Sequence, residues 1–186
     1  MAALLKDFAR SYYAPRMLYR DIAQGHRSRS WVYVLLYCLI YVVGSLWLYA
    51  EGYSPFVSPW LVIPQGSYYL VQAFYIVPLV FLMWILATGV ISVLARFAGG
   101  RGAFHRLLEM SGFSLWAPWY PLIIVDVIHA TPEWLYNVVL ALCMLLILRG
   151  TTVAVMEEER VGLFPAFGAT AAAFVSIGLI LFTYIR

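Results

Sequence analysis

Three side chains at the end of a long apolar run could together bind a metal ion. Asp126, His129 and Glu133 lie close together in the stretch "VDVIHATPEW". Carboxylate and imidazole groups are ligands that suit zinc or manganese. An acidic residue inside a membrane span is by default a functional candidate. The stretch therefore offers a candidate metal site, to which Glu51 from a facing loop could add a fourth ligand.

The alternative is that this stretch is only the place where one helix ends and the next begins. Asp126 lies four residues before the expected end of its span, roughly 6 Å below the interface at 1.5 Å per residue, where water reaches it. Thr131 and Pro132 are typical of a helix cap and a helix start, and Glu133 complements a helix N-terminus. The spacing matches no known metal motif. We favour the helix end and keep the metal site as the alternative.

The chain contains none of the residue patterns that would predict an enzyme. It lacks a nucleophile motif with a plausible base, a His-Glu-x-x-His pair, and the aspartate pair of an intramembrane protease. Its glycine cluster lacks the Lys-Ser/Thr of a phosphate loop. We therefore expect a protein that is not an enzyme and that needs no cofactor.

The composition indicates a membrane protein. Hydrophobic residues make up 64% of the chain and charged residues 11%, whereas soluble domains carry about 25% charged residues. Runs of about 20 apolar residues are long enough to cross a bilayer. The sequence predicts an all-α polytopic membrane protein, with an amphipathic segment at residues 1–30 and a bundle of five transmembrane helices in residues 31–186. The expected spans are residues 31–50, 68–95, 111–130, 132–150 and 163–185.

The basic residues predict the orientation of these spans. Eleven of the 12 Lys and Arg residues fall before the first span or in the loops after the second and fourth. Cytoplasmic loops carry an excess of such residues. We expect an inner-membrane protein with a cytoplasmic N-terminus and an outside C-terminus. The eleven are Lys6, Arg10, Arg16, Arg20, Arg27, Arg29, Arg96, Arg101, Arg106, Arg149 and Arg160.

The N-terminal segment has apolar residues at helical spacing, including Leu5, Phe8 and Tyr12. Such a helix either lies in the plane of the membrane among anionic headgroups or packs on the ends of its own spans. The sequence leaves both open. The basic residues do not indicate nucleic-acid binding, because no stacking aromatics or binding motif accompany them.

The acidic stretch Met156 to Arg160 is expected to be a solvated loop, as charge runs usually are. The alternative is that its glutamates form ion pairs with the N-terminal segment. The pairs considered join Glu157, Glu158 or Glu159 to Arg16, Arg20 or Arg27.

Small residues and prolines shape the expected spans. Gly168, Ala172 and Ser176 recur at intervals of four in the fifth span. Such ladders let helices approach closely, so we expect a packing seam, either within the chain or between protomers. We expect Pro78, Pro118 and Pro121 to kink their helices.

The glycine-rich stretch after the second span resembles a known family. Its characteristic positions are Gly99, Gly100, Gly102, Phe104, Gly112, Phe113 and Pro118, and "YYAPRMLYRDI" precedes the first span. These features resemble the Yip family of Rab/Ypt-interacting membrane proteins, in a short bacterial or archaeal form. The resemblance implies five spans, a cytoplasmic N-terminus and no catalytic residue. The chain lacks the Asp-Leu-Tyr-Gly-Pro tract of the trafficking members, so Rab binding is not carried over.

These observations predict a non-enzymatic membrane scaffold or organising factor. It would bind membrane lipids, a cytoplasmic protein or a second copy of the chain. The expected interface residues are Arg16, Arg20, Gly99, Gly100, Gly102 and Phe104. The alternative is a small transporter or channel for an ion, metal or solute that uses the kinked second and third spans with Asp126 and His129.

Overall fold

The computed structural model describes residues 2–25, 29–53, 63–127 and 133–184, and the regular elements within these ranges are all helices. Three of them are long and apolar enough to cross a membrane: α3 (Ser30–Ala50), α4 (Tyr68–Phe97, preceded by the 3-10 turn η1, Gln65–Ser67) and α7 (Glu133–Glu159). In α8 (Leu163–Tyr184), the stretch Leu163–Ile177 is a shorter apolar helix. The expected all-α polytopic fold is confirmed.

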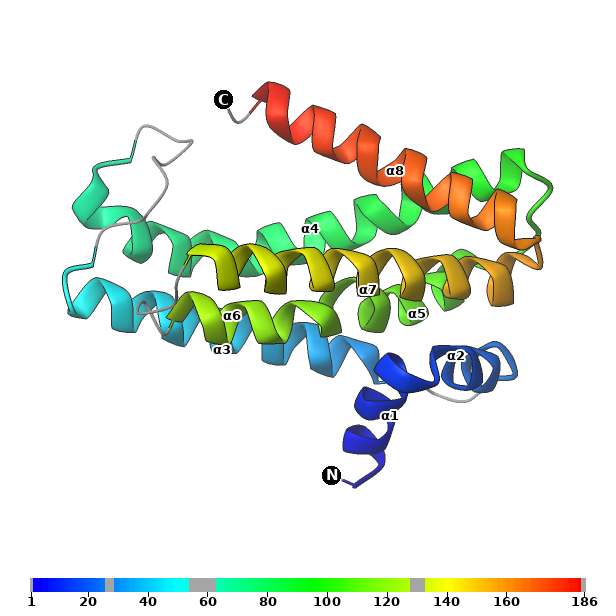
Figure 1. Cartoon of the computed structure of the whole chain (residues 1–186), viewed down its shortest axis with the longest axis horizontal. Helices are drawn as coiled ribbons and strands as arrows, with labels where there is room; N and C mark the ends of the chain where they lie inside the picture. Colours follow the sequence, from blue (N-terminus) through cyan, green and yellow to red (C-terminus); the bar gives the residue numbers. More distant parts are fainter. Residues whose placement is uncertain (1, 26–28, 54–62, 128–132, 185–186) are drawn as a thin grey trace.

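Helices α3, α4 and α7 run along the long axis of the molecule, and the N-terminal helix lies below them at a steep angle to that axis (Figure 1). Helix α8 packs on α4 and α7. Helices α1 (Ala2–Tyr13) and α2 (Pro15–Ala23) meet near Ala14, where Pro15 starts α2. Proline is well suited to a first helical position because its missing N–H would have no partner there.

The region expected as the third span is two helices rather than one. Helix α5 (Phe104–Trp116) is followed by the 3-10 turn η2 (Ala117–Trp119) and then by α6 (Tyr120–Val127). Pro118 lies within η2, where it cannot donate the hydrogen bond that would continue α5. Pro121 lies in the first turn of α6, where the missing N–H costs little. Helix α4, by contrast, continues through Pro78.

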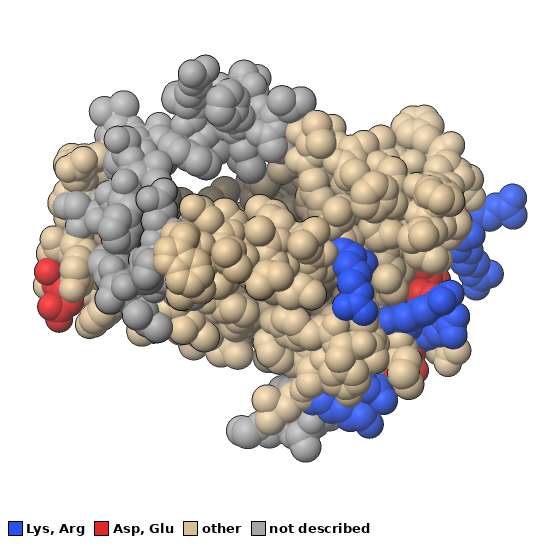
Figure 2. All heavy atoms as spheres, in the orientation of Figure 1, with Lys and Arg blue, Asp and Glu red and all other residues tan. Residues whose placement is uncertain are grey.

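Helices α4 and α7 extend beyond the apolar spans expected from the sequence. Helix α4 has 30 residues and is therefore about 45 Å long, against about 30 Å for a hydrocarbon core. Helix α7 runs on to Glu159, although its span was expected to end at residue 150. We call the end formed by α2, residues 98–103 and the last turn of α7 the charged end, because Lys and Arg side chains gather there (Figure 2).

Buried polar side chains join the helices inside the bundle. The Trp84 Nε1–H donates to Ser111 Oγ at 2.9 Å, and the Thr88 and Ser111 hydroxyls are 2.7 Å apart. A Cβ on Gly112 would lie 2.7 Å from Ser30 Cβ, so this glycine lets α5 approach the start of α3. Small and hydroxyl-bearing residues are the usual means of joining helices in a membrane, where no hydrophobic force acts between them.

The small residues expected to form a seam in α8 do not pack within the chain. Gly168, Ala172 and Ser176 are exposed, and a Cβ on Gly168 would meet nothing within 4 Å. The residues of α8 that are buried in the bundle are Ala166, Ala169, Thr170 and Ala173. The intrachain alternative is therefore wrong for the expected ladder. A contact between protomers through Gly168, Ala172 and Ser176 stays a prediction.

Candidate functional site at the charged end

The acidic stretch is helical and two of its carboxylates are buried. Glu157, Glu158 and Glu159 form the last turn of α7, and Glu158 and Glu159 are only 5% and 1% exposed. The expectation of a solvated loop is wrong. A charged side chain can be buried when other hydrogen-bond donors take the place of water around it. Here the connection between α4 and α5 supplies such donors to the carboxylates of Glu158 and Glu159.

Glu159 connects α7 to both α4 and the following connection. Its Oε1 accepts a hydrogen bond from Ser92 Oγ at 3.0 Å, and its Oε2 accepts one from the Gly102 N–H at 2.7 Å. Its backbone carbonyl accepts a third hydrogen bond from the Arg101 N–H at 3.2 Å. One residue thus fixes the end of α7 against two other segments.

Glu158 serves as a cap for α5 from a distant part of the chain. Its Oε1 accepts a hydrogen bond from the N–H of Ala103, the N-cap residue of α5, at 2.7 Å. The first four N–H groups at a helix start have no partner within the helix, and the helix dipole favours a negative charge there. Since Ala103 has no side-chain oxygen, the cap comes from α7 instead.

The glycines between α4 and α5 make this close approach possible. Gly99 has a φ of 91°, which ends α4 in a left-handed turn; its N–H bonds to the Arg96 carbonyl and that of Gly100 to the Ala95 carbonyl. A Cβ on Gly100 would lie 2.7 Å from Glu159 Oε2, and one on Gly102 would lie 2.7 Å from the Glu158 carbonyl oxygen.

Two of the predicted interface glycines therefore face α7. Gly100 and Gly102 are partly buried, whereas Gly99 and the first residue of α5, Phe104, are exposed.

Glu157 joins the N-terminal segment to α7. Arg16 Nε donates to one carboxylate oxygen at 2.5 Å and Arg20 Nε to the other at 2.9 Å. The hypothesis that the glutamates pair with N-terminal arginines is confirmed for Glu157. Arg27 lies outside the described residues.

The N-terminal segment also packs on the bundle through apolar contacts. Leu18, Tyr19 and Ile22 of α2 are at most 2% exposed and belong to the same core cluster as Phe113 of α5. Of the two alternatives for the N-terminal segment, packing on its own helices is confirmed for α2.

Removing the charge of Glu157 is expected to destabilise the fold only slightly. The Arg16 and Arg20 side chains are 61% and 55% exposed, and exposed ion pairs contribute about 0–1 kcal/mol. Glu157→Gln should lower the melting temperature in detergent by about 2–4 °C at low salt, since about 1 kcal/mol corresponds to that shift in a chain of this size. The decrease should shrink at high salt because exposed charges are screened.

The matched control is Glu51→Gln, which removes an exposed charge just after the last residue of α3, at the end of that helix far from Glu157. A decrease for Glu157→Gln that is unchanged by salt, or one that Glu51→Gln reproduces, would contradict the role of the ion pairs.

The candidate metal site falls largely outside what the structure describes. Asp126 lies in α6 and Glu133 begins α7, but their side chains, like the whole of His129, are outside the described residues. No three His, Cys, Asp or Glu residues come together as metal ligands in the described part of the chain. The site at Asp126, His129 and Glu133 stays a prediction.

Sequence reasoning missed Ser92 and the N–H groups of Gly102 and Ala103 as partners of the glutamates. These donors lie 55 to 67 positions from Glu158 and Glu159, and local patterns cannot pair such distant segments. One signal was present: the stretch from Thr151 to Glu159 contains no glycine or proline, which favours continuation of α7.

At the charged end, buried carboxylates lie next to neutral hydrogen-bond donors, and exposed basic side chains lie outside them. This arrangement holds segments in place and presents positive charge. A family model described as the Yip1 domain matches residues 9–185 of the chain. No curated protein and no solved structure shows significant similarity to the chain.

Proposed function

Because the chain belongs to the Yip family of membrane proteins, we propose that it is a non-enzymatic membrane scaffold or organising factor. In this role it presents the charged end of its bundle to lipids or to a cytoplasmic protein. The family match and the apolar helices place the chain in a membrane.

The distribution of charge supports an orientation with the charged end in the cytoplasm. Basic residues are concentrated in α1, α2 and the connection after α4, which lie toward the same end of the bundle (Figure 2). Segments rich in Lys and Arg remain on the cytoplasmic side. The proposed location is the inner membrane, with the N-terminus cytoplasmic and the C-terminus outside.

The proposal is supported by the contacts that hold the charged end in one conformation. Glu157 holds α2, Glu158 holds the start of α5, and Glu159 holds the glycine turn. The outer sides of Arg16 and Arg20 remain exposed while their Nε atoms are bound to Glu157. A surface already held in one conformation loses less entropy when a partner binds, which is the property that a scaffold needs.

The transporter alternative has no comparable support. The cavity nearest the N-terminal helices has a volume of about 10 Å³ and is lined by Tyr12, Ser114 and Arg149 among others. Such a cavity has room for about one water molecule. The Asp126 side chain and His129, on which the transporter alternative rests, lie outside the described residues. No observation therefore favours a transporter, and we propose the scaffold alone.

A photo-crosslinking amino acid at His105 tests the proposal. His105 is exposed beside Phe104 at the start of α5, whereas Gln65 is exposed before α4 at the other end of the bundle and is the matched control position. In intact cells, the His105 variant should form discrete crosslinks to lipid or protein that the Gln65 variant does not form.

Proteoliposomes supply the second measurement. We expect no flux of ions or small solutes above that of protein-free vesicles. Crosslinks that are identical at the two positions, together with protein-dependent flux, would replace the scaffold with a transporter.

A further inference from the structure

Helix α1 has an apolar arc wider than the bundle can cover. At 3.6 residues per turn, Phe8, Tyr12, Leu5, Ala9 and Tyr13 follow one another round about 140° of the helix surface. Phe8 stacks on Tyr33 with ring centroids 5.5 Å apart, and the Tyr12 hydroxyl donates to the Ala117 carbonyl. The first part of the arc is thus bound to α3 and η2.

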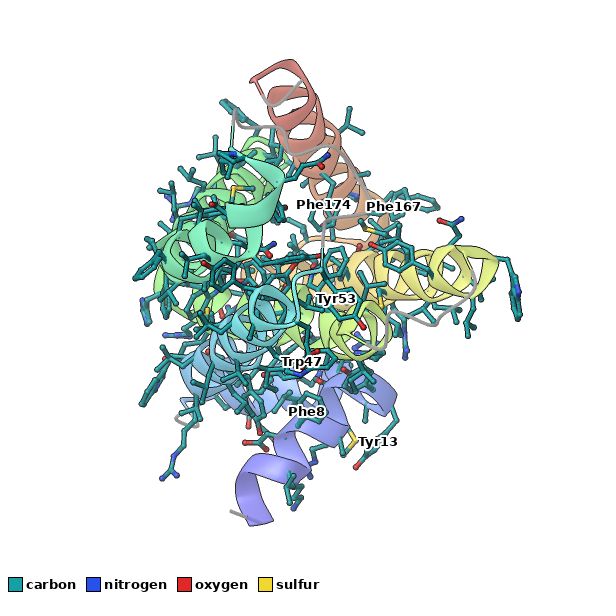
Figure 3. The ribbon with its side chains drawn as sticks, turned by 90° about the vertical axis from the view of Figure 1, so that its left-hand side faces the viewer. Phe8, Tyr13, Trp47, Tyr53, Phe167 and Phe174 are labelled. Atoms are coloured by element: carbon teal, nitrogen blue, oxygen red, sulfur yellow. The ribbon has the colours of Figure 1, made fainter. Side chains whose placement is uncertain are left out.

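The rest of the arc is not covered by any of the residues that the structure describes. Leu5 and Tyr13 are 65% and 68% exposed, and Ala9 between them is exposed too. Met17 of α2, one turn beyond Tyr13 in sequence, is 59% exposed. Viewed along the bundle, Phe8 lies on the inner side of α1 and Tyr13 on its outer side (Figure 3).

The position of α1 places this face at the border of the apolar layer. Helix α1 runs across the axis of the bundle rather than along it (Figures 1 and 3). Its contact residue Tyr33 belongs to the first turn of α3, which is the beginning of a membrane span. Trp31 and Leu35, near the same end of α3, are also exposed, as residues in contact with lipid would be. Because Phe8 stacks on Tyr33, α1 lies beside the end of α3 at which these exposed apolar residues begin.

Exposed basic side chains accompany α1 at this level. Lys6 is exposed on α1 itself, Arg29 directly precedes α3, and Arg149 donates from Nη1 to the Tyr12 carbonyl at 3.2 Å. Basic residues beside an amphipathic helix attract the anionic headgroups of the cytoplasmic leaflet.

From this geometry we propose that the Leu5–Ala9–Tyr13 face of α1 lies in the membrane interface and binds anionic phospholipids. The apolar side chains enter the border of the acyl chains, and Lys6, Arg29 and Arg149 contact the headgroups. The site deepens the proposed function by naming the lipid class, and it rests on the cytoplasmic orientation given there.

Fluorescence quenching in lipid nanodiscs tests this site with the full chain. Tyr13→Cys is labelled with a thiol-reactive, polarity-sensitive fluorophore, and Gln24→Cys, exposed at the end of α2, is the matched control. The native Cys38 and Cys143 are each 2% exposed, so the unmodified chain serves as the labelling blank. Leu5→Cys is a second, independent position on the same face.

We expect a lipid-borne quencher to act several-fold more strongly on the labels at Tyr13 and Leu5 than at Gln24. Aqueous iodide should show the opposite order. The emission of both α1 labels should shift further to the blue in nanodiscs containing phosphatidylglycerol than in phosphatidylcholine alone, and high salt should abolish this difference.

Each contrary result overturns a defined part of the proposal. Equal quenching by iodide at all three positions would place the α1 face in water. Protection of the α1 labels from both quenchers would mean that protein, a partner or a second copy, covers the face. Equal spectra in the two lipids would overturn the preference for anionic headgroups. None of these results depends on the crosslinking at His105, so the two proposals fail separately.

Discussion

Replacing Glu159 with alanine is expected to lower the melting temperature of the detergent-solubilised protein by about 6–12 °C. The substitution leaves the Ser92 hydroxyl and the Gly102 N–H without their acceptors in a place from which water is largely excluded. Loss of hydrogen bonds to a charged group, with buried donors left unpaired, costs about 3 kcal/mol in all. At this chain length each kcal/mol lowers the melting temperature by about 2–4 °C.

A double-mutant cycle with Ser92 separates this explanation from a simple loss of packing. Ser92→Ala alone removes one hydrogen bond to Glu159, but in the Glu159→Ala background that hydrogen bond is already absent. The second substitution should therefore cost less in the double variant than alone, as expected for residues in one network. Glu159→Gln, which keeps the shape and one carbonyl oxygen, should lie between the wild type and Glu159→Ala. Strictly additive effects would exclude the network.

Gly102→Ala is the second substitution expected to have a large effect. The new Cβ would lie 2.7 Å from the Glu158 carbonyl oxygen and 2.9 Å from its carbonyl carbon. The obstacle is backbone, so the turn and α7 must separate. Forcing a methyl group into a packed site costs about 2 kcal/mol, or about 4–8 °C in melting temperature.

The matched control for this substitution is Gly89→Ala on α4. A Cβ at Gly89 meets nothing within 4 Å and its φ is not positive, and alanine stabilises a helix interior by about 1 kcal/mol relative to glycine. The control should therefore leave the melting temperature unchanged or raise it slightly. If Gly102→Ala behaved like Gly89→Ala, the close approach of the turn to α7 would be excluded.

Gly102→Ala also links stability to the proposed scaffold. Separation of the turn from α7 breaks the hydrogen bonds that Glu158 and Glu159 accept from Ala103 and Gly102. The start of α5 then loses its fixed position, and crosslinks formed from His105 should weaken. Crosslinks that persist at full strength would show that partner binding does not require the locked charged end.

The sequence by itself determined the class of protein and its family. Long runs of apolar residues are stable only where they are removed from water, in lipid or in a large protein core. In lipid, a helix is the local structure in which the backbone N–H and C=O groups bond to one another. The all-α polytopic fold and the membership of the Yip family were therefore predictable from composition, run length and the glycine positions around Gly99 and Gly112. These features are local, and local sequence is sufficient to predict them.

Only the tertiary structure decided where the charges and small residues lie. Glu157 and Glu159 are neighbours in the acidic stretch, yet one pairs with exposed arginines and the other is buried against Ser92 and Gly102. Gly168 fits a packing pattern but lies on the outer face of α8. The physical reason is that burial depends on which distant segments supply donors or surface. Such pairings are set by the packing of whole helices, and no short stretch of the chain contains them.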